Sequence, residues 1–353
     1  MKKMVAIAAC AALVAGSAFA EDGWNVSGGL YTGATANFDD STVSMVNQDF
    51  GNNRIRINAN YTNENVGFKS RVEFAAKSSS TWKTSIEDDT WAANLQTPQF
   101  VYGYGYADLF DGALSLKVGR MYANDFGANF SGFGMYGNGG ALTWNTPVEG
   151  LSFGINGYIP SSKLSASETW DFWKDTLYYG ASYGNDYFSV SAGFGREACY
   201  GNEGSILTAV SVSPIDQLSF FAETDVLSVT EDAPAFEAFG DITVSPVDAL
   251  SIDLLYTVEA TLGEDKSFDN GVFESEVTYG FTDAITADLI DGVNFNGDGY
   301  QGFYVMPGAK FQLGPKTSMN AYYCYESEKG AMSLTKAAVS AGNSIIIDFA
   351  FGF

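Results

Sequence analysis

Charged side chains occupy every second position in several segments of the chain, a spacing that could place them together on one wet face. The basic candidates are Arg54, Arg56, Lys69, Arg71, Lys77 and Lys117. The acidic candidates are Glu223, Asp225, Glu237, Asp241, Asp253, Glu259, Glu274, Glu276 and Asp288. A single such charge is more simply a solvated surface residue, but several on one face favour a function. A basic surface opposite an acidic one would set a field that orients dipolar solutes, and the acidic excess would favour cations.

The composition excludes several other kinds of chemistry. The chain has 353 residues and no histidine, which excludes mechanisms that use imidazole as base, proton shuttle or metal ligand. Because no other set of nucleophile and base stands out, we expect no enzymatic activity, no cofactor and no metal site. With 42 Asp and Glu against 18 Lys and Arg, the net charge of -24 also argues against nucleic-acid binding.

The segments that carry these charges alternate as β-strands with two unlike faces do. In residues 53–62, Ile55 and Ile57 alternate with Arg54 and Arg56, and the C-terminal residues 345–353 alternate in the same way. The 39 glycines and 20 tyrosines suit short strands and turns better than long helices. Beyond residue 20 no uninterrupted apolar run reaches the roughly 18 residues of a membrane-spanning helix, which argues against a helical membrane protein.

A recurring turn phrase separates the strands. Pro followed by Asp or Glu, with Leu-Ser at the start of the next strand, occurs after Thr146, Ser213 and Ser245, and we expect each Pro to set the turn backbone. Polar segments that we predict to be long loops alternate with these turns, among them residues 122–139 and 292–299. Nine such loops and eight short turns predict 18 strands, with 16 as the alternative.

Two β architectures compete for this pattern. A soluble β-sandwich would bury its apolar faces between two sheets and would not need to confine its short turns to one end. A closed barrel in lipid turns apolar side chains outward and polar ones toward the lumen, and closure removes the sheet edge that hydrocarbon does not tolerate. The sequence therefore predicts an all-β, transmembrane antiparallel β-barrel with short periplasmic turns and long external loops.

The N-terminus has the pattern of an export signal. Lys2 and Lys3 precede a short apolar core at residues 4–14 and small residues at 18–20, so we expect residues 1–20 to be cleaved and residues 21–353 to form a single barrel domain. A short membrane anchor is the alternative, although the apolar core is brief. The remaining cysteines, Cys199 and Cys324, could form one disulfide, but the strand order sets them far apart.

The export signal, the alternating strands and the terminal aromatic Phe353 together resemble bacterial outer-membrane porins, and general diffusion porins in particular. Residues 116–120 and the Gly-rich segment 122–139 are similar to the region where the fifth strand of these porins leads into the third external loop. The resemblance implies that this loop folds into the lumen as a constriction, with these candidate residues: Asp125, Phe126, Phe130 and Phe133.

The resemblance also implies that Arg120 lines the constriction. Simple alternation places Arg120 with Leu116 and Val118, so an inward side chain requires a bulge at Gly119. The family further implies an outer-membrane location in contact with lipid, recognition of Phe353 by the barrel-assembly machinery, and a homotrimer. Two features depart from it: general porins have 16 strands, and their third loop is richer in acids than this one, which has only Asp125.

Three tyrosines, Tyr102, Tyr104 and Tyr106, alternate with glycines. Facing the lumen, they could form a track on which sugars stack, as in sugar-specific porins. We expect them to face outward, because aromatic girdles occur at both membrane surfaces.

The function that the sequence predicts is a passive, water-filled channel for small hydrophilic solutes and ions, with a preference for cations. The alternatives are a sugar-selective porin, and a surface adhesin or structural barrel whose lumen is plugged.

Overall fold

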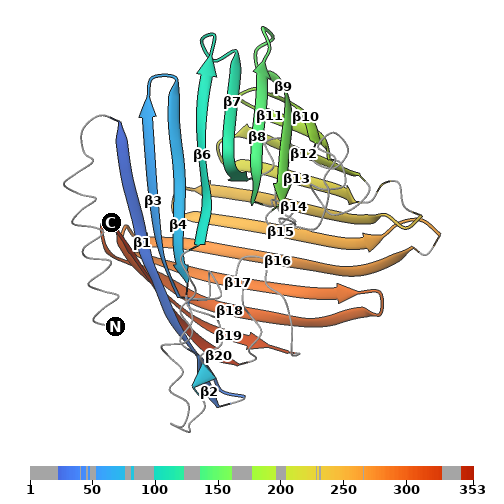
Figure 1. Cartoon of the computed structure of the whole chain (residues 1–353). Helices are drawn as coiled ribbons and strands as arrows, with labels where there is room; N and C mark the ends of the chain where they lie inside the picture. Colours follow the sequence, from blue (N-terminus) through green and yellow to red (C-terminus); the bar gives the residue numbers. More distant parts are fainter. Residues whose placement is uncertain are drawn as a thin grey trace. The chain divides into compact units, whose positions relative to one another are not determined.

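The structure, a computed structural model, describes residues 23–39, 41–44, 47, 53–75, 81–82, 99–122, 136–160, 177–195, 204–227, 229, 232–264, 266–327 and 343–353. Within these residues the fold is all-β, a closed antiparallel barrel of 18 long strands with two short additions, β2 (Thr42–Ser44) and β5 (Thr81–Trp82) (Figure 1). The prediction of 18 strands is confirmed, and the alternative of 16 is wrong. No helix in the described part of the chain is long and apolar enough to cross a membrane.

The strands belong to two compact units. Unit 1 comprises Met1–Val101, Glu276–Val293 and Gln301–Phe353, and unit 2 comprises Tyr102–Ser275 and Asn294–Tyr300. The strands that lie wholly or mostly in unit 1 are β1 (Trp24–Asn37), β3 (Arg54–Asn63), β4 (Val66–Ala75), β17 (Ile285–Asn296), β18 (Gly299–Gly314), β19 (Thr317–Glu326) and β20 (Ser344–Gly352).

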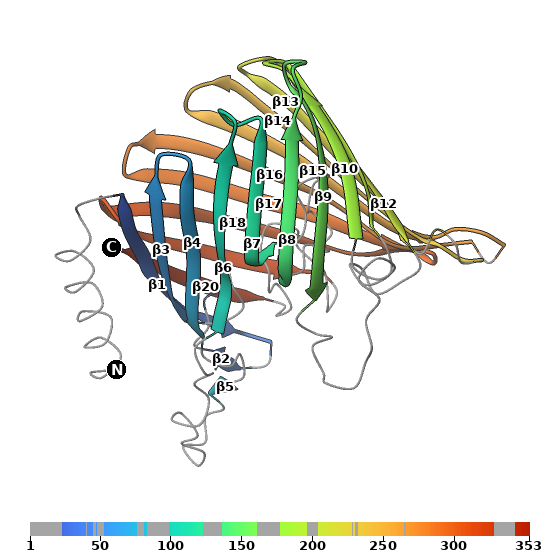
Figure 2. The same ribbon diagram turned by 45° about the horizontal axis from the view of Figure 1, so that its top comes forward.

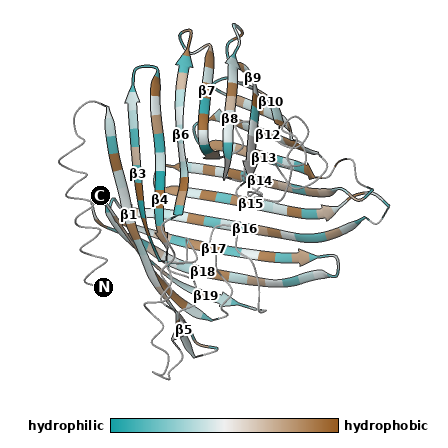
Figure 3. Ribbon diagram, in the orientation of Figure 1, coloured by the Kyte–Doolittle hydropathy of each residue, from teal (hydrophilic) through white to brown (hydrophobic). Residues whose placement is uncertain are grey.

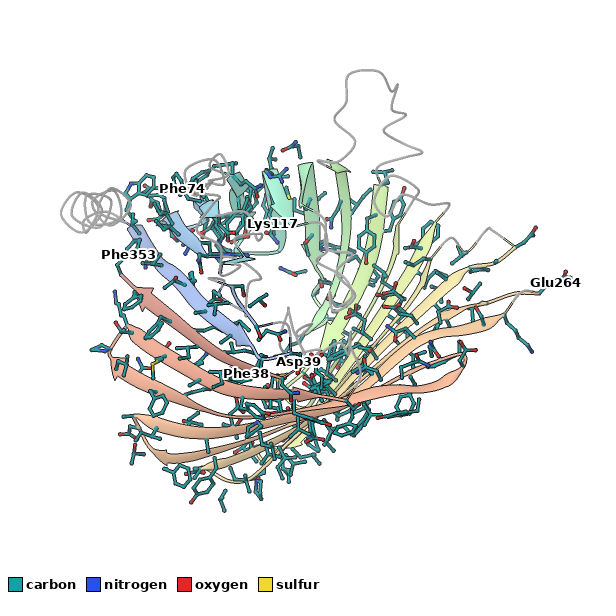
Figure 4. All side chains as sticks on the ribbon, turned by 90° about the horizontal axis from the view of Figure 1, so that it is seen from below. Phe38, Asp39, Phe74, Lys117, Glu264 and Phe353 are labelled. Carbon is teal, nitrogen blue, oxygen red and sulfur yellow. The ribbon has the colours of Figure 1, made fainter. Side chains whose placement is uncertain are left out.

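In unit 1, the first and last long strands of the chain pair with each other. The first half of β1 pairs with β3, and its second half pairs with β20, from Gly29 opposite Gly352 to Asn37 opposite Ser344. The terminal Phe353, labelled in Figure 4, extends this pairing, because its N–H donates to the carbonyl oxygen of Gly28 at 3.0 Å. The chain termini therefore leave no free strand edge at this junction.

Unit 2 is a run of hairpins in which each strand pairs with the next from β6 to β15. Figure 2 shows β6, β7, β8 and β9 side by side. The strands are β6 (Gln99–Leu109), β7 (Leu114–Tyr122), β8 (Tyr136–Asn145), β9 (Leu151–Pro160), β10 (Leu177–Gly184), β11 (Phe188–Gly195), β12 (Ser205–Ile215), β13 (Leu218–Leu227), β14 (Ala235–Val247), β15 (Leu250–Thr261) and most of β16 (Ser267–Thr282).

The two faces of the strands differ as the alternation predicts. In β20 the side chains of Ile345 and Ile347 are exposed, whereas Ser344, Ile346 and Asp348 are buried. Hydropathy alternates along many of the strands in Figure 3. We call the face with the buried charged side chains the polar face and the opposite one the apolar face. Large exposed apolar side chains are what a lipid-facing surface requires.

Aromatic pairs lie on the apolar face close to the strand ends that are joined by short turns. Trp24 packs against Tyr61 with ring centroids 5.1 Å apart, and in unit 2 Trp144 stacks on Phe153 at 6.0 Å. Aromatic rings combine an apolar body with a polarisable face, so they are stable where hydrocarbon meets water. Their position is typical of an interfacial girdle.

Two predictions about connections are wrong. Pro214 and Pro246 lie at the ends of β12 and β14, where the pairing register shifts, and not in the turns that follow. Proline has no N–H for a regular ladder, so the irregular strand end accommodates it. The predicted long loop at 292–299 is a turn of two residues, Gly297 and Asp298, because β17 and β18 continue to either side of it. Its Gly/Asn/Asp composition suits a tight turn equally well.

Candidate functional site

Four of the predicted basic residues share the polar face of β3 and β4. Arg54 and Arg56 lie two positions apart on β3. Arg71 of β4 lies opposite Asn58 of β3, and Arg71 Nε donates a hydrogen bond to Asn58 Oδ1 at 2.8 Å. Lys69 lies opposite Asn60 on the same face. Period-two alternation in one hairpin therefore brings these basic groups together, as the sequence predicted.

A carboxylate that was not among the candidates links the two arginines. Glu73 lies directly opposite Arg56, and its Oε1 accepts from Arg56 Nε at 2.7 Å while Oε2 accepts from Arg54 Nη1 at 3.1 Å. We call Arg54, Arg56 and Glu73 the basic triad. Its residual charge is positive, because one carboxylate balances only one of two guanidinium groups. The alternation that selected the arginines also selects Glu73, so charge balance across the hairpin could have found it.

A group of opposite sign lies on the polar face of β16, β17 and β18. The ammonium of Lys310 is 3.0 Å from Glu276 Oε1 and 3.0 Å from Asp288 Oδ2. The side chain of Asp288 is 0% exposed, whereas Glu276 is 18% and Lys310 is 37% exposed. We call Glu276, Asp288 and Lys310 the acidic triad. Sequence reasoning found its two acids but missed Lys310, because its role depends on how three consecutive strands align in the sheet.

Hydrogen bonds from neighbouring strands hold Asp288 in place. Tyr322 Oη donates to Asp288 Oδ2 at 2.7 Å, and Thr278 Oγ1 donates to Asp288 Oδ1 at 3.2 Å. Tyr322, on β19, reaches β17 over Gly308 of β18, where a Cβ would overlap the tyrosine ring. A buried carboxylate is stable only when its oxygens are satisfied, and these donors, with Lys310, meet that requirement.

In unit 2, six of the predicted acids lie on one face of β13, β14 and β15. Cross-strand register puts Asp225 opposite Glu237, and Glu237 opposite Glu259. We call these three residues the acidic row. The other members of this face are Glu223, Asp241 and Asp253. Like charges directly opposite one another destabilise a sheet, so the acidic row has no structural advantage that explains it. Glu274, on β16, is also buried.

The register of β6 and β7 corrects the orientation of the tyrosines. Tyr106 lies directly opposite Lys117, and Tyr104 lies opposite Gly119. Directly opposed residues share a face, so the tyrosines share that of Lys117, a residue labelled in Figure 4. The rings of Tyr102 and Tyr104 are 6.2 Å apart, which places Tyr102 there too. The prediction that they face outward is wrong, because the neighbouring glycines, with Leu116 and Val118 opposite, form the apolar face.

The same register bears on Arg120. Pairing passes through Gly119 on both sides of β7 without a shift, with Arg120 opposite Gly103 and Asn138. The bulge that an inward Arg120 requires is therefore absent from the ladder, although Gly119 has a φ of +138°. Regular alternation places Arg120 on the face of Leu116 and Val118, and not on that of Lys117.

Solved structures with a similar fold exist. A double-substitution variant of OccD1 (OprD) has a TM-score of 0.56 and 12% identity, with 95% of this chain and 96% of that chain covered. A loop-deletion variant of OmpT from Vibrio cholerae has a TM-score of 0.51 and 13% identity, with 94% and 99% covered. OprB of Pseudomonas putida at low pH has a TM-score of 0.50 and 12% identity, with 94% and 93% covered.

The chain has the porin-like fold of outer-membrane β-barrels. No family model matches the sequence, and no curated protein matches it. At identities of 12% and 13% the likeness concerns the fold, so the candidate residues of this porin-like barrel are argued from its own geometry.

Several predictions concern residues outside the described part of the chain. These are the signal at residues 1–20, Lys77, Cys199, and the constriction-loop candidates Asp125, Phe126, Phe130 and Phe133. Cys324 is described, and it is a buried free cysteine. Among the described residues, no group of three or more Cys, Asp and Glu side chains is arranged to hold a metal ion.

One feature of the polar face was not predicted. Apolar side chains form a buried cluster next to Asp288 in unit 1: Ile290, Tyr304, Met306, Tyr322, Cys324 and Ile346. Alternation assigned Ile346 to the polar side of its strand, but it did not indicate that these side chains would pack together. Tyr322 belongs to this cluster, so its ring is packed and its hydroxyl is held where it binds Asp288.

Proposed function

We propose that the chain is an outer-membrane porin that forms a passive, water-filled channel for small hydrophilic solutes and ions. The observation that carries this proposal is the division of the strands into two faces within a porin-like barrel. Charged groups such as the basic and acidic triads occupy the polar face, and exposed Ile, Leu, Val and Phe side chains occupy the other. A polar lumen inside a lipid-facing apolar band is the arrangement that lets hydrated solutes cross a membrane.

We further propose that the channel prefers cations. The acidic row supports this preference, because three carboxylates directly opposite one another across β13, β14 and β15 create a strongly negative surface. The acidic triad adds a further negative charge. The basic triad on β3 and β4 acts in the opposite sense, but its net charge is smaller than that of the acidic groups combined.

Planar-bilayer recordings of the folded, purified protein test both statements. We expect stepwise current increments, and in a KCl gradient a reversal potential of the sign for cation preference. The variant with Glu237→Gln and Glu259→Gln should shift the reversal potential toward anions. Asp248→Asn, which likewise removes one negative charge but lies in the β14–β15 turn, should not shift the reversal potential. Absence of stepwise current would contradict the channel and favour a plugged adhesin or structural barrel, while anion preference would contradict the charge assignment.

A sugar-selective porin is the second candidate, because Tyr102, Tyr104 and Tyr106 share a face with Lys117. Aromatic rings spaced along one face provide stacking surfaces for sugar rings. If the candidate is correct, maltotriose should reduce the ion current, and Tyr104→Ala should weaken this reduction. Tyr179→Ala, on the apolar face of β10, is the matched control. Equal sensitivity of the two variants would contradict a sugar track.

Export, assembly and oligomeric state complete the proposal. We infer that residues 1–20 are removed on export, that Phe353 is recognised by the barrel-assembly machinery, and that three copies associate in the outer membrane. Mass spectrometry of the outer-membrane protein should give Glu21 as its first residue, and deletion of Phe353 should lower the amount assembled. Chemical cross-linking in membranes should yield trimers, and a monomer pattern would contradict them.

A further inference from the structure

Lys310 occupies a position between two carboxylates that could otherwise bind a cation. Its ammonium lies 3.0 Å from an oxygen of Glu276 and 3.0 Å from an oxygen of Asp288. Calcium binds carboxylate oxygens at about 2.3–2.6 Å and completes its shell with water. A divalent cation at the position of the ammonium could therefore contact both carboxylates after only a small adjustment.

The two carboxylates are held ready for a cation. Asp288 receives hydrogen bonds from Tyr322 at 2.7 Å and from Thr278 at 3.2 Å, which keep its side chain in one orientation. Gly308 leaves the space through which the ring of Tyr322 reaches it. Because these supports come from β16 and β19, they persist when the lysine on β18 is changed. Removing the ammonium would thus leave the carboxylates in place.

The position is open to ions that move along the polar face. The side chain of Lys310 is 37% exposed and that of Glu276 is 18% exposed, whereas Asp288 behind them is fully buried. Asn320, directly opposite Lys310 on β19, keeps this part of the face polar. An ion in the lumen could reach the position without displacing a packed side chain.

We propose that Lys310 is a built-in counterion that prevents Glu276 and Asp288 from holding divalent cations, and so keeps cations moving through the channel. This inference rests on the proposed channel function. Conduction requires sites that attract an ion but release it quickly, and two carboxylates without a fixed partner would retain a divalent ion too long. The lysine leaves one net negative charge, which attracts cations more weakly.

The test compares Lys310→Met with Lys316→Met, which removes the same charge from the exposed β18–β19 turn. In KCl, Lys310→Met should raise the ratio of cation to anion permeability by about two-fold, because a unit charge acts in opposite senses on a cation and an anion about 10 Å away through water, and the salt screens part of this effect. Calcium chloride in the millimolar range should then reduce the potassium current of Lys310→Met more strongly than that of the wild type and of Lys316→Met, which share the acidic row with it. Equal calcium sensitivity in all three would overturn the inference.

A second readout does not depend on conduction. Calcium should raise the thermal unfolding temperature of Lys310→Met in detergent by more than that of the wild type or of Lys310→Met combined with Glu276→Gln. If calcium stabilises Lys310→Met in this way but no variant gives stepwise current, the role of Lys310 as a counterion is supported and the channel function is overturned. If the variants give stepwise current but calcium affects them all equally, the channel function is supported and the counterion role is overturned. If Lys310→Met does not fold, the same measurements are made on Lys310→Gln, which also removes the charge, and the same results are expected.

Discussion

The basic and acidic triads have inverse compositions but are built differently. In the basic triad, two arginines two positions apart on β3 bind one glutamate on the adjacent strand, so a single hairpin supplies all three groups. In the acidic triad each residue comes from a different strand, and Asp288 has no exposed side-chain surface. The comparison shows that similar charge balances can depend on local pairing in one region and on tertiary packing in another.

The different construction of the two triads predicts that removing the carboxylate of each will destabilise the protein unequally, and this is the largest effect that we expect. Asp288→Ala removes the acceptor for Lys310, Tyr322 and Thr278 at a buried position, and should lower the free energy of unfolding by about 3 kcal/mol. Glu73→Ala should cost about 1 kcal/mol, because the arginines of the basic triad are partly exposed and can be hydrated. Urea unfolding in lipid vesicles measures both. Equal losses would show that burial of Asp288 does not distinguish the two triads.

The passage of Tyr322 over Gly308 gives a second and smaller effect. A methyl group from Gly308→Ala would overlap the tyrosine ring and displace its hydroxyl from Asp288, with an expected loss of about 2 kcal/mol. Gly314→Ala on the same strand is the control, because the nearest atom to its Cβ is Thr317 Cβ at 4.0 Å. Urea unfolding should show a change within about 0.5 kcal/mol for the control. A similar result for Gly308→Ala would mean that the ring shifts without losing its contact.

The hydroxyl of Tyr322 alone should contribute less. Tyr322→Phe keeps the ring and removes only the donor to Asp288, so we expect a loss of about 1 kcal/mol in the same unfolding measurement. The neighbouring residue provides the matched control, since Tyr323 is exposed and its hydroxyl donates to Asn343 at 3.3 Å. Tyr323→Phe should be nearly neutral. If both variants unfold alike, the hydroxyl does not fix Asp288.

The smallest expected effect is the change in ion permeability when one positive charge is removed from either triad. Arg56→Gln and Lys310→Met each remove one positive charge, and each should raise cation over anion permeability by about two-fold in KCl. Only Lys310→Met should become more sensitive to calcium than the wild type, because it leaves two carboxylates, whereas Arg56→Gln leaves one carboxylate paired with Arg54. Calcium titration of the current in bilayers distinguishes them. Calcium block of both variants would show that the number of carboxylates does not matter.

The sequence could predict what depends on alternation. Strand faces follow from a period of two, so the arginines of β3 and the acids of β13, β14 and β15 were placed on shared faces correctly. Alternation does not state which face of an isolated strand is polar, so the three tyrosines of β6 were assigned outward on the expectation of an aromatic girdle. Their register with Lys117 resolved this, and register between strands depends on backbone pairing that a single segment does not reveal.

The amino-acid order by itself determined the barrel class, the number of strands and the two-faced character of each strand, because these depend on local periodicity and on turn composition. Only the tertiary structure decided that Lys310 lies between Glu276 and Asp288 and that Tyr322 crosses Gly308 to reach Asp288. Those contacts depend on the hydrogen-bond register between strands and on the absence of a side chain at Gly308. Their geometry exists only once the sheet has formed.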